Sequence, residues 1–143
     1  MVVAAFSGVN ESTFEHLKLF YWPFVIYTIY EWLKYGKDMC GFFSVKLKSL
    51  LLSLAFIVVF FYTYRGILGF NIDFLNIADF FIAAAISRFY EMAASRRNCS
   101  NRCDKLSLLA IVLIGVMFVL FTYLPPRIAL FMDPKGFYGI NTF

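Results

Sequence analysis

The sequence predicts an all-α protein, a transmembrane helical bundle of four spans that forms a single integral membrane domain over residues 1–143. First, 62% of its residues are hydrophobic and only 15% are charged, whereas a soluble domain carries about 25% charged side chains. Second, four apolar stretches, at about 13–33, 47–64, 73–94 and 106–124, are each long enough to cross a hydrocarbon core of roughly 30 Å. Nothing alternates as barrel strands do, so helices are the remaining solution.

The first two stretches are helical for different reasons. The first is preceded by a capping-box pattern, in which Ser12 and Glu15 satisfy each other's backbone amides at the start of a helix. The second is the most apolar part of the chain: from Leu50 to Phe61 it contains no charge, and Ser53 is its only polar side chain. Its composition is typical of a helix that faces lipid or a protein core.

The third stretch begins near Asp73 and is less apolar than the others. Four small or polar side chains recur at every fourth position, and we expect this stripe to pack against another helix: Asp79, Ala83, Ser87 and Glu91. Arg88 and Glu91 lie near the end of the stretch, where long side chains can reach the headgroups, so we leave them out of the candidate site. The fourth stretch stops at Pro125 and Pro126, which cannot continue a helix.

The basic residues predict the orientation. Nine of the 13 lysines and arginines lie in or next to the connections after the first and third stretches: Lys34, Lys37, Lys46, Lys48, Arg88, Arg96, Arg97, Arg102 and Lys105. The positive-inside rule then places loops 34–48 and 95–105 in the cytoplasm and both termini outside the cell membrane. Because residues 1–9 are too short for a signal peptide, an outward amino terminus also predicts a further helix upstream.

This topology gathers the unusual polar side chains at the extracytoplasmic side. The candidate site consists of Asn10, Glu11, Glu15, His16, Lys18, Tyr62, Tyr64, Arg65, Asp73 and Asp79. Asp79 is the sharpest candidate, since it lies six residues after Asp73 and therefore roughly 9 Å along the helix. An ionisable group at that depth usually faces the bundle interior, a charged partner or an aqueous cavity. The structural alternative is an ion pair of Asp79 with Lys18 or Arg65.

His16 is the only histidine, and its ordinary role at a membrane interface is a hydrogen bond or a pairing with a carboxylate. Paired with Asp73 or Asp79, it could act as a general base or proton carrier. No paired-histidine motif is present, so we predict no metal site, and the sequence identifies no cofactor. The three cysteines, Cys40, Cys99 and Cys103, fall in predicted cytoplasmic connections, where a reducing environment argues against disulfides.

The main prediction is an integral membrane protein whose biochemical function is unknown and whose polar cluster binds a ligand; three alternatives remain. A membrane-embedded enzyme acting on a lipid or small substrate would use His16 or Glu15 as a base, with Asp79 as an orienting group and Lys18 or Arg65 holding an anion. An ion or proton transporter subunit would need a polar path along the third stretch, because the second and fourth offer none. A structural or assembly subunit would use the polar ends to lock helices together.

The partners that these readings imply are the lipid bilayer and either a second copy of the chain or another membrane subunit. The net charge of +4 is explained by the membrane anchors, so we expect no nucleic acid.

Three blocks of the sequence resemble a known group. Residues 9–19, V-N-E-S-T-F-E-H-L-K-L, are similar to the V-N-E-S-x-W-E-H-L-K-L signature of an uncharacterised family of small prokaryotic multi-pass membrane proteins. Residues 62–67 and 125–134 resemble two further blocks of that family in the same order. The chain departs from the pattern at Phe14 (usually tryptophan), Arg65 (a small hydroxyl residue) and Arg127 (histidine), and it lacks the helix that precedes the signature. The resemblance implies the topology and the location of the site, and no activity.

Overall fold

The structure is a computed structural model that describes residues 13–70, 72–94 and 101–124, apart from the side chains of residues 15 and 101–103. Its elements are α2 (Thr13–Lys34), the short 3-10 helix η1 (Gly36–Asp38), α3 (Phe42–Leu68), α4 (Asp73–Ala94) and α5 (Asn101–Tyr123). Over these described ranges the chain is helical and contains no strand, so the predicted all-α fold class is confirmed.

The predicted boundaries hold best where apolarity and helix coincide. Helix α4 spans the predicted residues 73–94, and α2 extends one residue beyond the predicted 33. Helix α3 begins at Phe42 rather than near residue 47, and α5 begins at Asn101 rather than near residue 106. Hydropathy marks the apolar part of a helix and misses its charged first turns. Glycines in the left-handed conformation flank α3, Gly41 (φ 72°) before it and Gly69 (φ 75°) after it.

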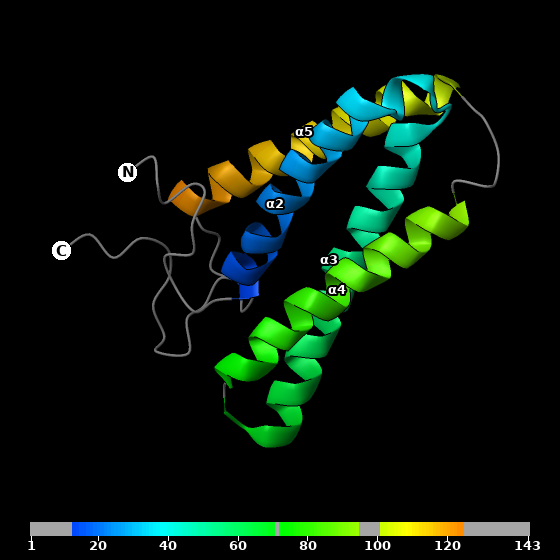
Figure 1. The fold of residues 1–143 in the computed structure, drawn as a ribbon. Coiled ribbons are helices and arrows are strands. Elements are labelled where there is room, and N and C mark those ends of the chain that lie inside the picture. The colour runs from blue at the N-terminus through cyan, green and yellow to red at the C-terminus, as the bar shows by residue number, and fades with distance from the viewer. Residues whose placement is uncertain (1–12, 71, 95–100, 125–143) are drawn as a thin grey trace.

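The four long helices form two arms that meet at one end of the molecule (Figure 1). Helices α2 and α5 lie along each other in one arm, and α3 and α4 in the other. In the first arm, the Tyr21 hydroxyl of α2 donates a hydrogen bond to the Ile111 carbonyl oxygen of α5 at 2.7 Å. At the shared end, the Ser44 amide of α3 donates to the Asp104 carboxylate of α5 at 2.9 Å. The first turns of α3 and α5 therefore lie side by side.

Helices α3 and α4 pack through polar side chains. Asp79, Ala83, Ser87 and Glu91 are the buried residues of α4, as the four-residue spacing predicted. The Ser53 hydroxyl donates to the Ala83 carbonyl oxygen at 3.0 Å, and the Ser49 hydroxyl donates to the Glu91 carboxylate at 2.9 Å. These two buried serines of α3 therefore face the stripe on α4.

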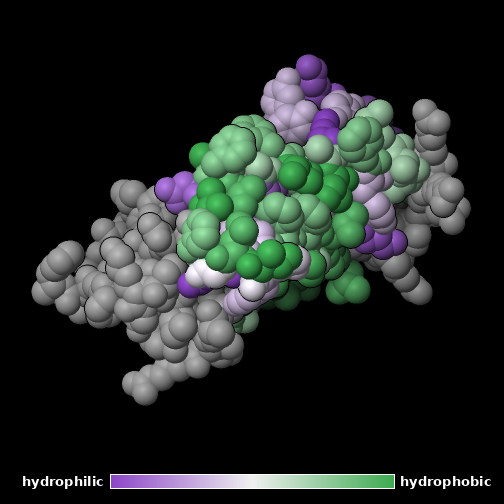
Figure 2. Space-filling view, turned by 90° about the horizontal axis from the view of Figure 1, so that it is seen from below, coloured by the Kyte–Doolittle hydropathy of each residue, from purple (hydrophilic) through white to green (hydrophobic). Residues whose placement is uncertain are grey.

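The surface of the described helices is largely apolar. Figure 2 looks at the bundle from the end where α3 stops and α4 begins, and most of the coloured surface in that view is hydrophobic, with separate hydrophilic patches. Two described segments are long and apolar enough to cross a membrane, Phe42–Leu68 and Asp104–Tyr123. Helices α2 and α4 are less apolar and are not among these segments.

Candidate functional site

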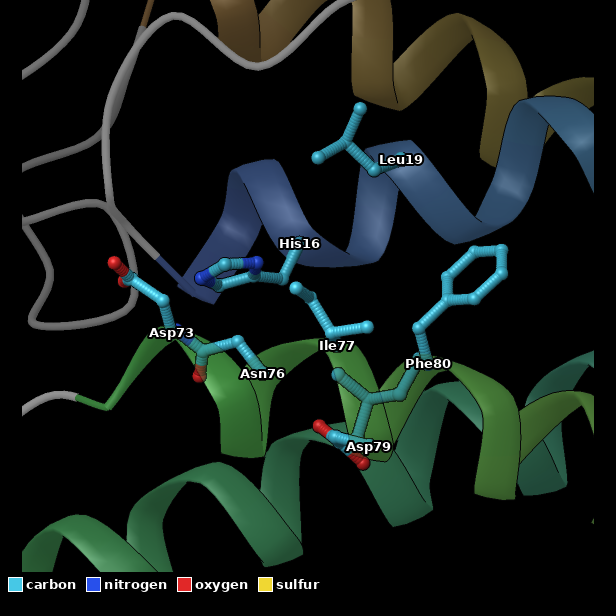
Figure 3. A pocket seen from close by; sticks show the side chains of 8 residues that line it. His16, Leu19, Asp73, Asn76, Ile77, Asp79 and Phe80 are labelled. Carbon is cyan, nitrogen blue, oxygen red and sulfur yellow. The ribbon is translucent and has the colours of Figure 1, made fainter.

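A cavity of about 470 Å³ opens between α2, α3 and α4 (Figure 3). Its polar lining comes from one turn of α2 and two turns of α4, and apolar side chains complete it. The lining residues are His16, Leu19, Ile57, Asp73, Asn76, Ile77, Asp79 and Phe80. Three of the predicted site residues, His16, Asp73 and Asp79, thus line one cavity.

Helical spacing explains how these groups converge. Asp73, Asn76 and Asp79 are three residues apart, so they project from neighbouring positions on α4. Figure 3 shows His16 on the side of α2 that faces Asp73 and Asn76, with Asp79 deeper and closer to α3. The His16 ring also contacts Phe61 of α3, with a centroid separation of 5.6 Å. Each of the three helices therefore contributes to the position of the imidazole or of the carboxylates.

Asp79 is the most unusual group of the cavity. Its side chain is buried, with 4% of its surface exposed, and its Oδ1 oxygen has no hydrogen-bond donor among the residues that the structure describes. Burying a carboxylate without a partner costs several kcal/mol or more. The neighbouring Asn76, in contrast, accepts a hydrogen bond from the Tyr64 hydroxyl. An unsatisfied carboxylate beside a cavity is the arrangement expected when the missing donor comes from a ligand.

The two predicted cations of the cluster have other contacts. The Lys18 ammonium is fully buried on the α5 side of α2, where it donates to Thr122 Oγ1 at 3.4 Å. The Arg65 guanidinium lies over the Phe61 ring, 5.7 Å from its centroid. The structural alternative, an ion pair of Asp79 with either residue, is therefore not formed. Neither Lys18 nor Arg65 lines the cavity.

The remaining candidates divide into three groups. Tyr62 is exposed, and Tyr64 reaches the cavity through its bond to Asn76. Asn10 and Glu11, together with the side chain of Glu15, lie outside the described part of the structure.

A second polar cluster, which the sequence reasoning missed, joins α2, α3 and α4. The Lys46 ammonium donates to the carboxylates of both Glu31 and Glu91, the latter at 2.8 Å. The Arg88 guanidinium donates to the same two carboxylates at 2.7 and 2.8 Å. The expectation that Arg88 and Glu91 extend toward headgroups was wrong: Glu91 is 11% exposed, and half-exposed Arg88 is held by both carboxylates. We call these four residues the ion network.

Hydroxyl groups complete the ion network. Ser49 and Tyr35 each donate to a carboxylate oxygen, at 2.9 Å to Glu91 and at 2.5 Å to Glu31. Partial burial of the Tyr35 hydroxyl, followed by its bond to the Glu31 carboxylate and the charge of that group, raises the pKa of Tyr35 to about 12. Tyr35 therefore remains a donor at neutral pH. The signal in the sequence was Glu31 itself, an ionisable residue within an apolar helix.

The prediction that the cysteines form no disulfide was wrong. Cys40, which lies between η1 and α3, is disulfide-bonded. The basic residues of this connection predicted a cytoplasmic and therefore reducing environment. A disulfide is instead typical of an oxidising compartment. The basic residues therefore favour a cytoplasmic location for this end of the bundle, whereas the disulfide favours an extracytoplasmic one.

Comparison with known proteins identifies a family and no function. Residues 1–140 match the model of a family of unknown function, DUF6512. No curated protein and no solved structure matches the chain.

Proposed function

We propose that this chain, which belongs to the family of unknown function DUF6512, is a multi-pass membrane protein that binds a small ligand in the cavity beside Asp79. The ligand presents hydrogen-bond donors or a positive charge to the Asp79 and Asp73 carboxylates. His16 and Asn76 provide further polar contacts, and Leu19, Ile77 and Phe80 cover the apolar part of the ligand.

The single observation that carries this proposal is the buried Asp79 Oδ1 oxygen without a donor among the described side chains. A ligand ammonium or hydroxyl group would satisfy it and offset the cost of its burial. The volume of about 470 Å³ also falls within the range of roughly 300–1,000 Å³ that is typical of small-molecule sites. A mainly apolar lining with a few convergent polar groups is the usual composition of such sites.

A four-span topology is supported by the outward faces of the two less apolar helices. Ile26 and Ile29 of α2, and Phe74, Phe81 and Phe89 of α4, are all more than half exposed. Lys18, Glu31, Asp79 and Glu91 are buried within the bundle, and Glu31 and Glu91 are paired in the ion network. Helices with apolar outer faces and paired inner charges fit a bilayer better than water. The prokaryotic origin and the signature of the resembling family remain predictions.

The orientation that we propose follows the basic residues, with loops 34–48 and 95–105 cytoplasmic and the cavity outside. Two of the nine residues behind this bias, Lys46 and Arg88, belong to the ion network and do not anchor a loop. The other basic residues of these two connections still favour a cytoplasmic location for this end of the bundle. The Cys40 disulfide favours the reverse orientation, and a labelling experiment distinguishes the two.

An assembly role is a second candidate, and the ion network favours it. Its four charges balance, and each carboxylate accepts bonds from both cations. A closed network of this kind holds helices together without leaving a group for a ligand. Enzymatic use of the cavity has less support, because Lys18 and Arg65, the residues expected to hold an anion, do not line it.

Native mass spectrometry of the detergent-extracted protein tests the proposal. We expect the wild type to carry a bound species other than detergent. In Asp79→Asn, the fraction of protein that carries this species should fall about tenfold, because a neutral amide replaces the carboxylate. Asp38→Asn is the matched control, since this exposed aspartate lies in η1, away from the cavity. Equal occupancy in all three proteins, or no bound species in the wild type, would contradict the proposal.

A further inference from the structure

A second cavity, of about 270 Å³, continues from the first along the same pair of helices. Phe80 lines both cavities. The second cavity is enclosed by Phe20, Pro23 and Tyr27 of α2 and by Ala84 and Ser87 of α4. Beyond Phe80 the lining is therefore mainly aromatic and aliphatic.

The lining residues of the two cavities lie along the same sides of α2 and α4, and we call this shared surface the groove. On α2 they are residues 16, 19, 20, 23, 24 and 27, and on α4 they are 73, 76, 77, 79, 80, 84, 87, 88 and 91. Apart from Asp79, which lies to one side of this face, toward α3, both series follow the three- and four-residue steps of a single helix face. The faces meet where the rings of Phe20 and Phe80 pack edge to face, 5.7 Å apart. From Ile77 to Ser87 the groove follows α4 for roughly 15 Å.

The two ends of the groove differ in chemistry. At the first end, Asp73 and Asp79 present carboxylates, and the Asp79 Oδ1 oxygen has no donor within the described helices. At the far end, Arg88 and Glu91 bond to each other at 2.8 Å and to the rest of the ion network, so they offer no free charge. Exposed Pro23 and Tyr27 bring the middle of the groove to the protein surface between α2 and α4.

We infer that this groove binds a single-chain amphiphile with a primary amine head group, entering sideways from the bilayer. The inference rests on the proposed function and names the class of its ligand. The ammonium group binds at Asp79 and Asp73, where it supplies the missing donors. The alkyl chain passes Phe80 and occupies the second cavity beside Ala84. The packed rings of Phe20 and Phe80 separate the two cavities, so the chain displaces one of these rings where it passes from the first cavity to the second.

Equilibrium binding of radiolabelled butylamine and hexadecylamine to the protein in nanodiscs tests the inference, with empty nanodiscs as background. The variant Ala84→Phe fills the second cavity, and its control is Ala85→Phe, at the neighbouring exposed position of α4. We expect Ala84→Phe to weaken hexadecylamine binding by about tenfold and to leave butylamine binding unchanged, which also shows that the variant folds. Ala85→Phe should change neither, and Asp79→Asn should weaken both.

Two results would overturn the inference. Hexadecylamine that binds Ala84→Phe as well as it binds the wild type would show that no chain occupies the second cavity. Binding of neither amine to the wild type would exclude this ligand class. In either case a bound species that Asp79→Asn loses in native mass spectrometry would leave the proposed function intact, so the two failures are distinguishable.

Discussion

At Gly115 of α5, the absence of a side chain lets Tyr21 of α2 pack closely against the α5 backbone. A Cβ atom at Gly115 would lie 2.6 Å from the Tyr21 hydroxyl oxygen, well inside contact distance. That hydroxyl cannot easily move, because Tyr21 is 2% exposed and its oxygen donates to the Ile111 carbonyl. Phe118 also packs on the Tyr21 ring, with centroids 5.1 Å apart. The close approach therefore depends on the absence of a side chain at position 115.

We expect Gly115→Ala to lower the free energy of unfolding by about 1–3 kcal/mol, the usual cost of overpacking a filled core. Gly66→Ala is the control: Gly66 lies within α3 and a Cβ there would meet nothing within 4 Å, so it should gain up to about 1 kcal/mol of helix propensity. Unfolding in mixed detergent micelles measures both. If Gly115→Ala is as stable as Gly66→Ala, the Tyr21 contact does not constrain α5.

At the scale of elements, the ion network fixes how three helices meet. Glu31 belongs to α2, Lys46 to α3, and Arg88 and Glu91 to α4. Lys46 is the central member, because it is 5% exposed and bonds to carboxylates on both neighbouring helices. Removing one member of a buried charge network leaves the others uncompensated, which is more costly than the network's net contribution to stability.

Lys46→Met should therefore destabilise the protein by about 3–5 kcal/mol, because two buried carboxylates would then share only the half-exposed Arg88. Lys48→Met, at an exposed position of the same helix, should change the unfolding free energy by less than about 0.5 kcal/mol. Adding Glu31→Gln to Lys46→Met should recover part of the loss. Equal stability of the two single variants would show that the network carries little of the packing energy.

The local pattern of the sequence predicted some of these features and missed others. The buried stripe of α4 followed from a four-residue period, because that period is a property of one helix, and the bounds of α4 followed from the apolar stretch. The burial of Asp79 followed from its place in the stripe. The partners of Lys46 could not be predicted from a local pattern, because Glu31 and Glu91 lie 15 and 45 residues away from it in the chain. A hydropathy window counts such a lysine as a loop anchor, and only the packing of three helices reveals that it is buried.

For the whole molecule, the fold separates two polar clusters along the bundle. The cavity with His16, Asp73 and Asp79 lies near the start of α2 and of α4, whereas the ion network lies toward the opposite ends of those helices. The first cluster is open and contains an unsatisfied carboxylate, and the second is closed by mutual ion pairs. We therefore expect one end to bind and the other to hold the helices together.

Accessibility at Ile77 tests the central claim, an open ligand cavity on the extracytoplasmic side. Ile77 lines the cavity and is 58% exposed. In a variant that carries Ile77→Cys and serine at the three native cysteine positions, a membrane-impermeant maleimide should label sealed right-side-out vesicles, and hexadecylamine should slow the reaction. Labelling only after the vesicles are permeabilised would contradict the orientation, and labelling from outside at a rate unaffected by the amine would contradict ligand occupancy of the cavity.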